Sequence, residues 1–93
     1  MDNIEAQRLL HDQLAAWRSK SHPELASLVG ESHDFEVTGP TGVWYQGHIR
    51  VVWDDQPHGN VRVIASIDDG GWRAFMPLTD DFIMRPDGTL IGE

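Results

Sequence analysis

Polar and apolar residues alternate through two segments in the middle of the chain, as expected for strands with one buried face. The apolar positions of residues 43–53 are Val43, Tyr45, Ile49, Val51 and Trp53, and those of residues 61–67 are Val61, Val63, Ala65 and Ile67. Residues 56–60 contain Pro57 and Gly59, so they are expected to form a five-residue loop. The pattern then predicts an antiparallel pair in which Trp53 lies opposite Val63.

A second turn is predicted at Asp68-Asp69-Gly70-Gly71, which places Asp-Gly where a type I′ turn needs two positive φ angles. A strand over residues 72–76 would follow and end at Pro77, which lacks the N–H of a paired strand. All six paired apolar side chains would then share one face. The predicted pairs are Ile67 with Trp72, Ala65 with Ala74, and Val63 with Met76.

Two helices are predicted before these strands. Over residues 3–19 a helical period gathers apolar residues on one side, namely Ala6, Leu9, Leu10, Leu14 and Trp17. Ser21-His22-Pro23-Glu24 has the outline of a capping box and opens a short helix to about Val29, ended by Gly30.

Two further hairpins are predicted on either side of the central strands. Residues 34–38 alternate and lead through Gly39-Pro40-Thr41-Gly42 into the strand at Val43. A small terminal hairpin is expected around Arg85-Pro86-Asp87-Gly88. The sequence therefore predicts one α+β domain over residues 1–93, with two N-terminal helices on one face of a four- to six-stranded antiparallel meander sheet.

Charge and composition limit the partners of this domain. Fifteen Asp and Glu against seven Lys and Arg give a net charge of −8, which would repel nucleic-acid phosphates. No stretch approaches the ~18 apolar residues of a membrane span, and the first ten residues lack the basic start and apolar run of a signal peptide. With no cysteine either, we expect a soluble cytoplasmic protein that binds neither nucleic acid nor membranes.

Catalytic, metal and cofactor sites are not predicted. The pairs Asp54-Asp55 and Asp80-Asp81 could hold a divalent cation with His58, but no spacing here matches a calcium-loop motif. Turn and strand-end Asp residues are the favoured interpretation. The five histidines form no metal-ligand or nucleophile motif, and no Gly-rich phosphate loop is present, so no cofactor is expected.

The second face of the predicted sheet is the candidate interaction face. It would carry Trp44, His48, Arg50, Val52, Ile64, Arg73 and Phe75. The arginines are expected to pair with Asp34, Glu36 or Asp54 across strands in preference to binding an anionic ligand. The apolar row Val52, Ile64 and Phe75 must be covered or exposed, and self-association is the economical explanation, against cover by the terminal hairpin.

The stretches 67–75 and 77–83, with the ending Pro86-Asp87-Gly88 to Gly92-Glu93, resemble a small family of uncharacterised bacterial proteins. That resemblance implies no activity. Helices followed by a bent antiparallel sheet also resemble the cystatin-like and NTF2-like folds, which implies dimerisation through the sheet or a small ligand between helix and sheet. The candidates for lining such a pocket are Tyr45, Trp53, Trp72 and His48 or Asp34.

The functional prediction is a non-catalytic interaction module that binds a protein partner or a second copy of itself. Small size and acidic charge also fit an immunity-type protein that blocks a basic toxin. The alternative class is a small-molecule-binding protein or enzyme with a pocket between helix and sheet. A cavity of roughly 300 Å³ or more with convergent polar groups would favour that alternative.

Overall fold

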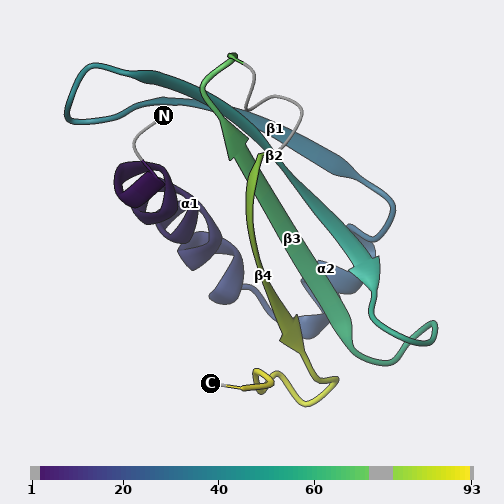
Figure 1. Ribbon diagram of the computed structural model, residues 1–93. Helices are drawn as coiled ribbons and strands as arrows, with labels where there is room; N and C mark the ends of the chain where they lie inside the picture. The colour runs from purple at the N-terminus through teal and green to yellow at the C-terminus, as the bar shows by residue number, and fades with distance from the viewer. Residues whose placement is uncertain (1–2, 72–76, 93) are drawn as a thin grey trace.

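The computed structural model describes residues 3–71 and 77–92, and in these residues two helices precede a four-stranded antiparallel sheet (Figure 1). The elements are α1 (Asn3–Arg18), α2 (His22–Ser27), β1 (Ser32–Thr38), β2 (Trp44–Trp53), β3 (Val61–Asp68) and β4 (Leu78–Met84). The strands are neighbours in chain order, so the sheet is a meander. The predicted α+β fold is confirmed.

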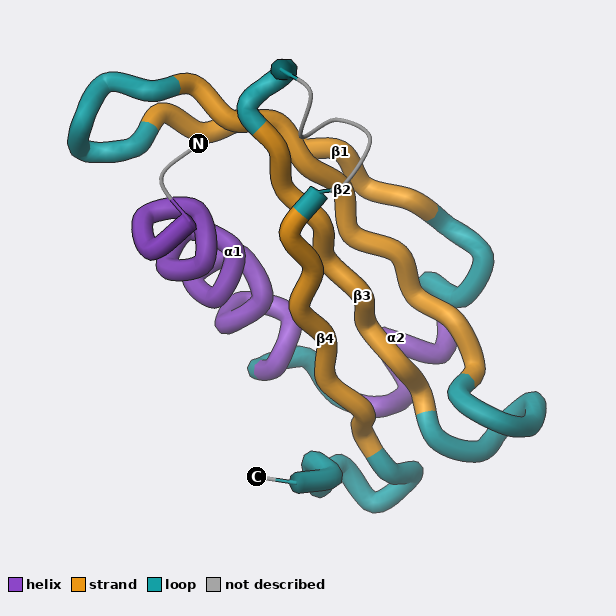
Figure 2. Tube along the Cα trace, in the orientation of Figure 1, coloured by secondary structure: helices purple, strands orange, loops and turns teal. Residues whose placement is uncertain are grey.

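Both helices pack on the same face of the sheet (Figure 2). The longer helix, α1, contacts β3 and β4, while α2 contacts β2 and β3. The predicted apolar stripe of α1 supplies its buried residues, which are Ala6, Leu10 and Leu14. No helix in the described part of the chain is long and apolar enough to span a membrane.

The second helix begins at the predicted cap. The Ser21 hydroxyl accepts a hydrogen bond from the Glu24 N–H at 3.3 Å, which satisfies one of the donors at the start of a helix. The helix ends at Ser27, two residues before the predicted end. Gly30 then turns the chain with a φ of 91° and donates its N–H to Val51 of β2, so the connection into β1 is tied to the sheet.

The hairpin from β1 to β2 forms at the predicted turn, where the Gly39 N–H donates to the Val43 carbonyl at 2.9 Å. Its tip is held against α1, because the Thr41 hydroxyl donates to the Glu5 carboxylate at 2.6 Å. On the helix side, Phe35 lies opposite Gly47, and a Cβ at Gly47 would collide with the Phe35 ring. Glycine is therefore needed at this position.

The register between β2 and β3 differs from the predicted one by two residues along β3. Trp53 lies opposite Val61, not Val63, and the Asp54 N–H donates to the Asn60 carbonyl at 2.9 Å. The predicted alternation still holds, because a shift of two residues leaves each side chain on its expected face.

The predicted pairing after β3 is wrong. Ile67 pairs with Leu78, Ala65 with Asp80 and Val63 with Phe82, so β4 occupies the place given to residues 72–76. The predicted strand itself, including Trp72, Ala74 and Met76, lies outside the described residues. The observed pairing engages β3 from Val61 to Ile67, whereas a five-residue partner would have left part of it unpaired.

The end of the chain folds back onto the outer edge of β4. The predicted turn forms, with the Arg85 N–H donating to the Thr89 carbonyl at 2.8 Å. Leu90 makes an isolated bridge to Met84, and the Ile91 N–H donates to the Ile83 carbonyl at 2.9 Å. The returning segment of this hairpin is thus much shorter than β4, and it pairs with only one end of the outer β4 edge.

The core lies between the helices and the sheet. Besides the three residues of α1 and Leu25 of α2, it contains Tyr45, Ile49 and Val51 of β2, Val61, Val63, Ala65 and Ile67 of β3, and Phe82 and Met84 of β4. The Arg18 guanidinium stacks over the Phe82 ring at 5.2 Å and covers this side of the core.

The revised position of β4 can be tested by stability measurements. Phe82 is 4% exposed, so Phe82→Ala should lower the free energy of unfolding by about 3–5 kcal/mol, because it leaves a cavity in the core. Thr79→Ala in the same strand is the control, and since Thr79 is exposed the change should stay within about 0.5 kcal/mol. Urea unfolding followed by circular dichroism measures both. Equal effects would contradict the assigned strand.

Candidate functional site

The face of the sheet away from the helices, here called the open face, carries the described part of the predicted interaction face. Because Tyr45, Ile49 and Val51 are buried against the helices, strand alternation places the even-numbered residues of β2 on the open face. Of the predicted interaction residues, those on the open face are Trp44, His48, Arg50, Val52 and Ile64. Arg73 and Phe75 lie outside the described residues.

One end of the open face is apolar. Val52 lies opposite Arg62, which lies opposite Ile83, while Arg50 and Asp81 flank Ile64 in the next row. Val52, Ile64 and Ile83 are each half-buried. We call these three residues, with Arg50, Asp54, Arg62 and Asp81 around them, the apolar end.

Ile83 was missed by the sequence analysis, which placed it in a terminal hairpin. A signal was present, because Leu78, Phe82 and Met84 keep the period of two expected for a strand with one buried face. The sequence analysis gave residues 82–84 to one strand of the terminal hairpin, so it recognised only the end of β4, and Asp80 interrupts the apolar series before that end.

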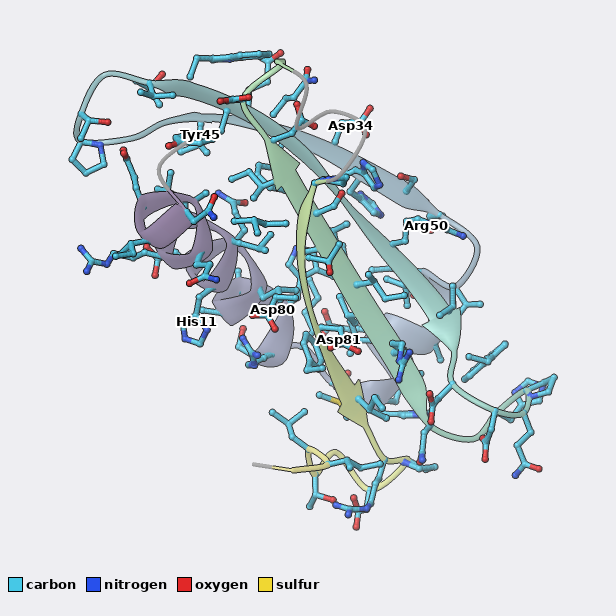
Figure 3. The ribbon with its side chains drawn as sticks, viewed as in Figure 1. His11, Asp34, Tyr45, Arg50, Asp80 and Asp81 are labelled. Atoms are coloured by element: carbon cyan, nitrogen blue, oxygen red, sulfur yellow. The ribbon has the colours of Figure 1, made fainter. Side chains whose placement is uncertain are left out.

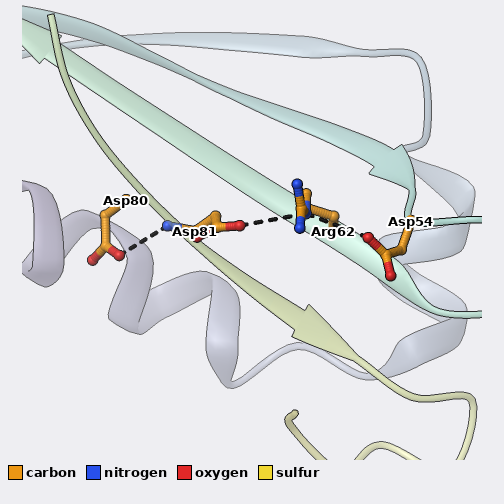
Figure 4. Close-up of polar contacts among 4 residues, drawn as sticks. All are labelled: Asp54, Arg62, Asp80 and Asp81. Atoms are coloured by element: carbon orange, nitrogen blue, oxygen red, sulfur yellow. Dashed lines mark hydrogen bonds and ion pairs between the residues drawn. The ribbon is translucent and has the colours of Figure 1, made fainter. Parts of the chain in front are cut away.

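Arg62 forms ion pairs with two carboxylates of the apolar end (Figure 4). Its Nε lies 3.4 Å from a carboxylate oxygen of Asp54 and 3.4 Å from one of Asp81. The predicted pairing of an arginine with Asp54 is therefore confirmed, and Asp81 is a second partner. In turn, Asp81 donates its N–H to the Asp80 carboxylate at 2.9 Å.

The other end of the open face is acidic. Asp34 of β1 lies opposite His48, and Glu36 lies opposite Gln46, whose side-chain amide donates to Asp68 at 3.0 Å. His48 contacts the Ser66 hydroxyl at 3.2 Å. We call Asp34, Glu36 and Asp68, with Gln46, His48 and Ser66, the acidic end.

A shallow depression of about 280 Å³ lies in the acidic end, lined by Asp34, Phe35, Glu36, Gln46, Gly47, His48 and Asp68. Within residues 3–71 and 77–92, no group of three or more His, Asp or Glu side chains is placed to hold a metal ion. The chemistry available at this end is therefore recognition of positive charge and of hydrogen-bond donors by exposed carboxylates.

The turn after β3 borders the acidic end and adds a further carboxylate. The Gly71 N–H donates to Asp69 at 3.0 Å, and this hydrogen bond holds the pKa of Asp69 below its usual value. A lowered folded-state pKa means that the charged carboxylate stabilises the fold at neutral pH, and that this contribution is lost as the pH falls through that pKa.

The residues proposed for a ligand pocket do not converge. Tyr45 is fully buried on the helix side of the sheet, and Trp53 packs there between the rings of His22 and His58. His48 and Asp34 lie on the open face (Figure 3 labels Tyr45 and Asp34). Trp72 lies outside the described residues. The predicted pocket lining is therefore wrong, because a sheet separates its members.

A different hollow, of about 530 Å³, lies at the border between α1 and β4. Its polar lining comes from Gln7, Arg8 and His11 of the helix and from Thr79 and Asp80 of the strand, with Ile4 and Leu10 as the apolar part. Figure 3 labels His11 and Asp80, which belong to the two sides of this hollow. Sequence reasoning missed it, because only the position of β4 brings these residues together.

Comparisons with known proteins give no match for this chain, whether family models, curated proteins or solved structures are compared.

The role of Arg62 can be tested with two matched variants. Arg62→Gln removes the cation between Asp54 and Asp81, so we expect a loss of about 0.5–1.5 kcal/mol of unfolding free energy at low salt, shrinking at ~1 M NaCl. Arg50→Gln is the control on the same face, because Arg50 makes no ion pair with another described residue, and it should cost under about 0.5 kcal/mol. Equal losses in urea unfolding of the two variants would contradict the bridging role.

Proposed function

We propose that the protein is a non-catalytic interaction module that associates with a second copy of itself through the apolar end of the open face. The observation that carries the proposal is a strip of three half-buried apolar side chains, Val52, Ile64 and Ile83, on the face that neither helix covers. Arg62 lies between Val52 and Ile83, and Ile64 lies in the adjacent row. Such a strip is stabilised when a partner removes it from water.

The charges around the strip support a self-complementary contact. Arg50 and Arg62 balance Asp54 and Asp81, so the apolar end is locally neutral although the chain carries a net charge of −8. In a two-fold dimer the same patch meets itself, and arginines of one copy can reach carboxylates of the other. Among the described residues, no arginine or lysine gives the acidic end such a balance.

The remaining parts of the proposal rest on the sequence. The net charge of −8 disfavours nucleic acid as a partner, and the absence of cysteine is compatible with a cytoplasmic location. A different protein with a matching apolar surface is the other occupant that the strip could accept.

Sedimentation equilibrium across a range of concentrations and salt tests self-association. The wild type should dimerise, and more tightly as salt rises, because screening weakens repulsion between two chains of −8. Ile64→Arg should weaken the dimer by about tenfold or more, since it places a charge in the strip.

Ile4→Arg is the matched control, because Ile4 is 73% exposed on α1 and distant from the strip. It should leave the dimer unchanged, with circular dichroism showing that both variants fold. A wild type that is monomeric at every concentration would overturn self-association, as would a folded Ile64→Arg variant that dimerises normally.

A second candidate function is favoured by the hollow between α1 and β4. Its size, about 530 Å³, and its cationic, anionic and amide groups meet the criterion for a small-molecule site. This would make the protein a ligand carrier or enzyme of the NTF2-like kind, although the hollow lies at the sheet edge and not beneath the sheet.

Binding of small fragments tests the second candidate. Fragments that occupy the hollow should shift the NMR amide signals of Gln7, Arg8, His11 and Thr79. Gln7→Trp should fill the hollow and abolish these shifts, whereas Gln56→Trp, in the β2–β3 loop, should not. If no fragment shifts these signals in the wild type, the hollow is not a ligand site.

A further inference from the structure

The outer edge of β1 offers unpaired backbone. β1 pairs with β2 on one side, and no strand of residues 3–71 or 77–92 pairs with its other side. The opposite edge of the sheet differs, because the bridge from Leu90 and the hydrogen bond from Ile91 cover part of β4. An unpaired strand edge is a template for a further strand.

The orientation of the backbone at this edge follows from the hairpin. Gly39 and Val43 form a hydrogen-bonded pair, and such pairs alternate along an antiparallel ladder with one-to-one register. Val37 and Phe35 therefore bond to β2, whereas Asp34 and Glu36 direct their N–H and C=O groups outward. The two acidic residues of β1 are thus the ones whose backbone is available.

The protection of this edge against strand addition is the charge of Asp34 and Glu36. β1, with the sequence SHDFEVT, contains neither proline nor lysine, and its register with β2 is continuous, without a bulge. Its side chains instead protect it against a second copy. If β1 of a second copy paired with it antiparallel, the registers with most overlap would place Asp34 or Glu36 opposite a carboxylate of the other copy. Like charges directly opposite one another destabilise such a pair.

The two faces of β1 define what would fit beside it. Asp34 and Glu36 are exposed on the open face, where Asp68 of β3 adds negative charge to the same depression. On the helix side, Phe35 and Val37 are only half-buried at the edge of the core. A neighbouring strand with basic residues on one face and small apolar residues on the other would match both.

We propose that β1 accepts an extended basic segment of another protein as a fifth strand, with Lys or Arg side chains beside Asp34 and Glu36. Its backbone hydrogen-bonds to these two residues, and its apolar face covers Phe35 and Val37. This surface is separate from the apolar end, so it does not depend on self-association.

The probe is a synthetic peptide of about nine residues that alternates Lys and Val, long enough to span β1. NMR titration should show saturable binding that weakens about tenfold or more between low and physiological salt. Hydrogen exchange of the Asp34 and Glu36 amides should slow at least tenfold, because their N–H groups become paired. A peptide of the same composition with its lysines in one block is the control and should bind at least tenfold more weakly.

Two variants separate backbone pairing from charge. Asp34→Asn, which keeps the backbone, should weaken binding severalfold. Asp34→Pro removes an outward N–H without removing a bond to β2, and it should weaken binding more than Asp34→Asn does. Should Asp34→Pro fail to fold, a peptide N-methylated at alternate residues gives the same comparison against the unmodified peptide. Ile64→Arg, which disrupts only the apolar end, should bind the peptide as the wild type does.

Three results would overturn the proposal. One is that the alternating peptide does not bind at about 1 mM, a concentration at which any Kd of about 1 mM or tighter would be detected. Another is equal binding of the alternating and block peptides, which would indicate attraction by charge alone. The third is binding without slower exchange at Asp34 and Glu36.

Discussion

The packing of α1 against β3 and β4 is the constraint on which the rest of the structure depends. Ala6, Leu10 and Leu14 form one stripe, and a helix with one apolar stripe can cover only one face of a sheet. The short α2 extends that cover over β2 on the same side. In residues 3–71 and 77–92, no helix covers the second face. The properties of that face then depend on the strand residues themselves.

Those residues divide the open face into two regions with different physical behaviour. Around Val52, Ile64 and Ile83 the arginines and aspartates balance, so burial of apolar surface can outweigh the cost of removing charges from water. Around Asp34, Glu36 and the half-buried Asp68, no described arginine or lysine pairs with the carboxylates, and this region is suited to cations. The two proposed contacts, with a second copy and with a basic strand, therefore depend on different chemistry.

Much of the fold could be predicted from the sequence because alternation fixes which face a residue occupies. The prediction placed five residues on the correct face although its β2–β3 register was shifted by two residues, and these are Trp44, His48, Arg50, Val52 and Ile64. The partner of β3 could not be chosen in this way, since apolar residues alternate in both 72–76 and β4, and in β4 Asp80 interrupts the series. Local turn chemistry favoured the nearer segment, whereas the pairing engages the more distant Leu78–Met84. The place of Ile83 on the open face and the hollow beside Asp80 both depend on the pairing of β4, so the sequence analysis missed them.

The short return of the chain at Leu90 and Ile91 has a consequence for assembly. These residues occupy one end of the β4 edge, while no strand of residues 3–71 or 77–92 pairs with the outer edge of β1. A chain cleaved after Gly88 would expose the whole of β4 as well. Both edge strands carry carboxylates, Asp34 and Glu36 on β1 and Asp80 and Asp81 on β4, so like charges would meet if the β4 edge of one molecule approached the β1 edge of the next. Loss of a few terminal residues would thus leave unpaired backbone along both edge strands of the described sheet, with like charges opposing their pairing.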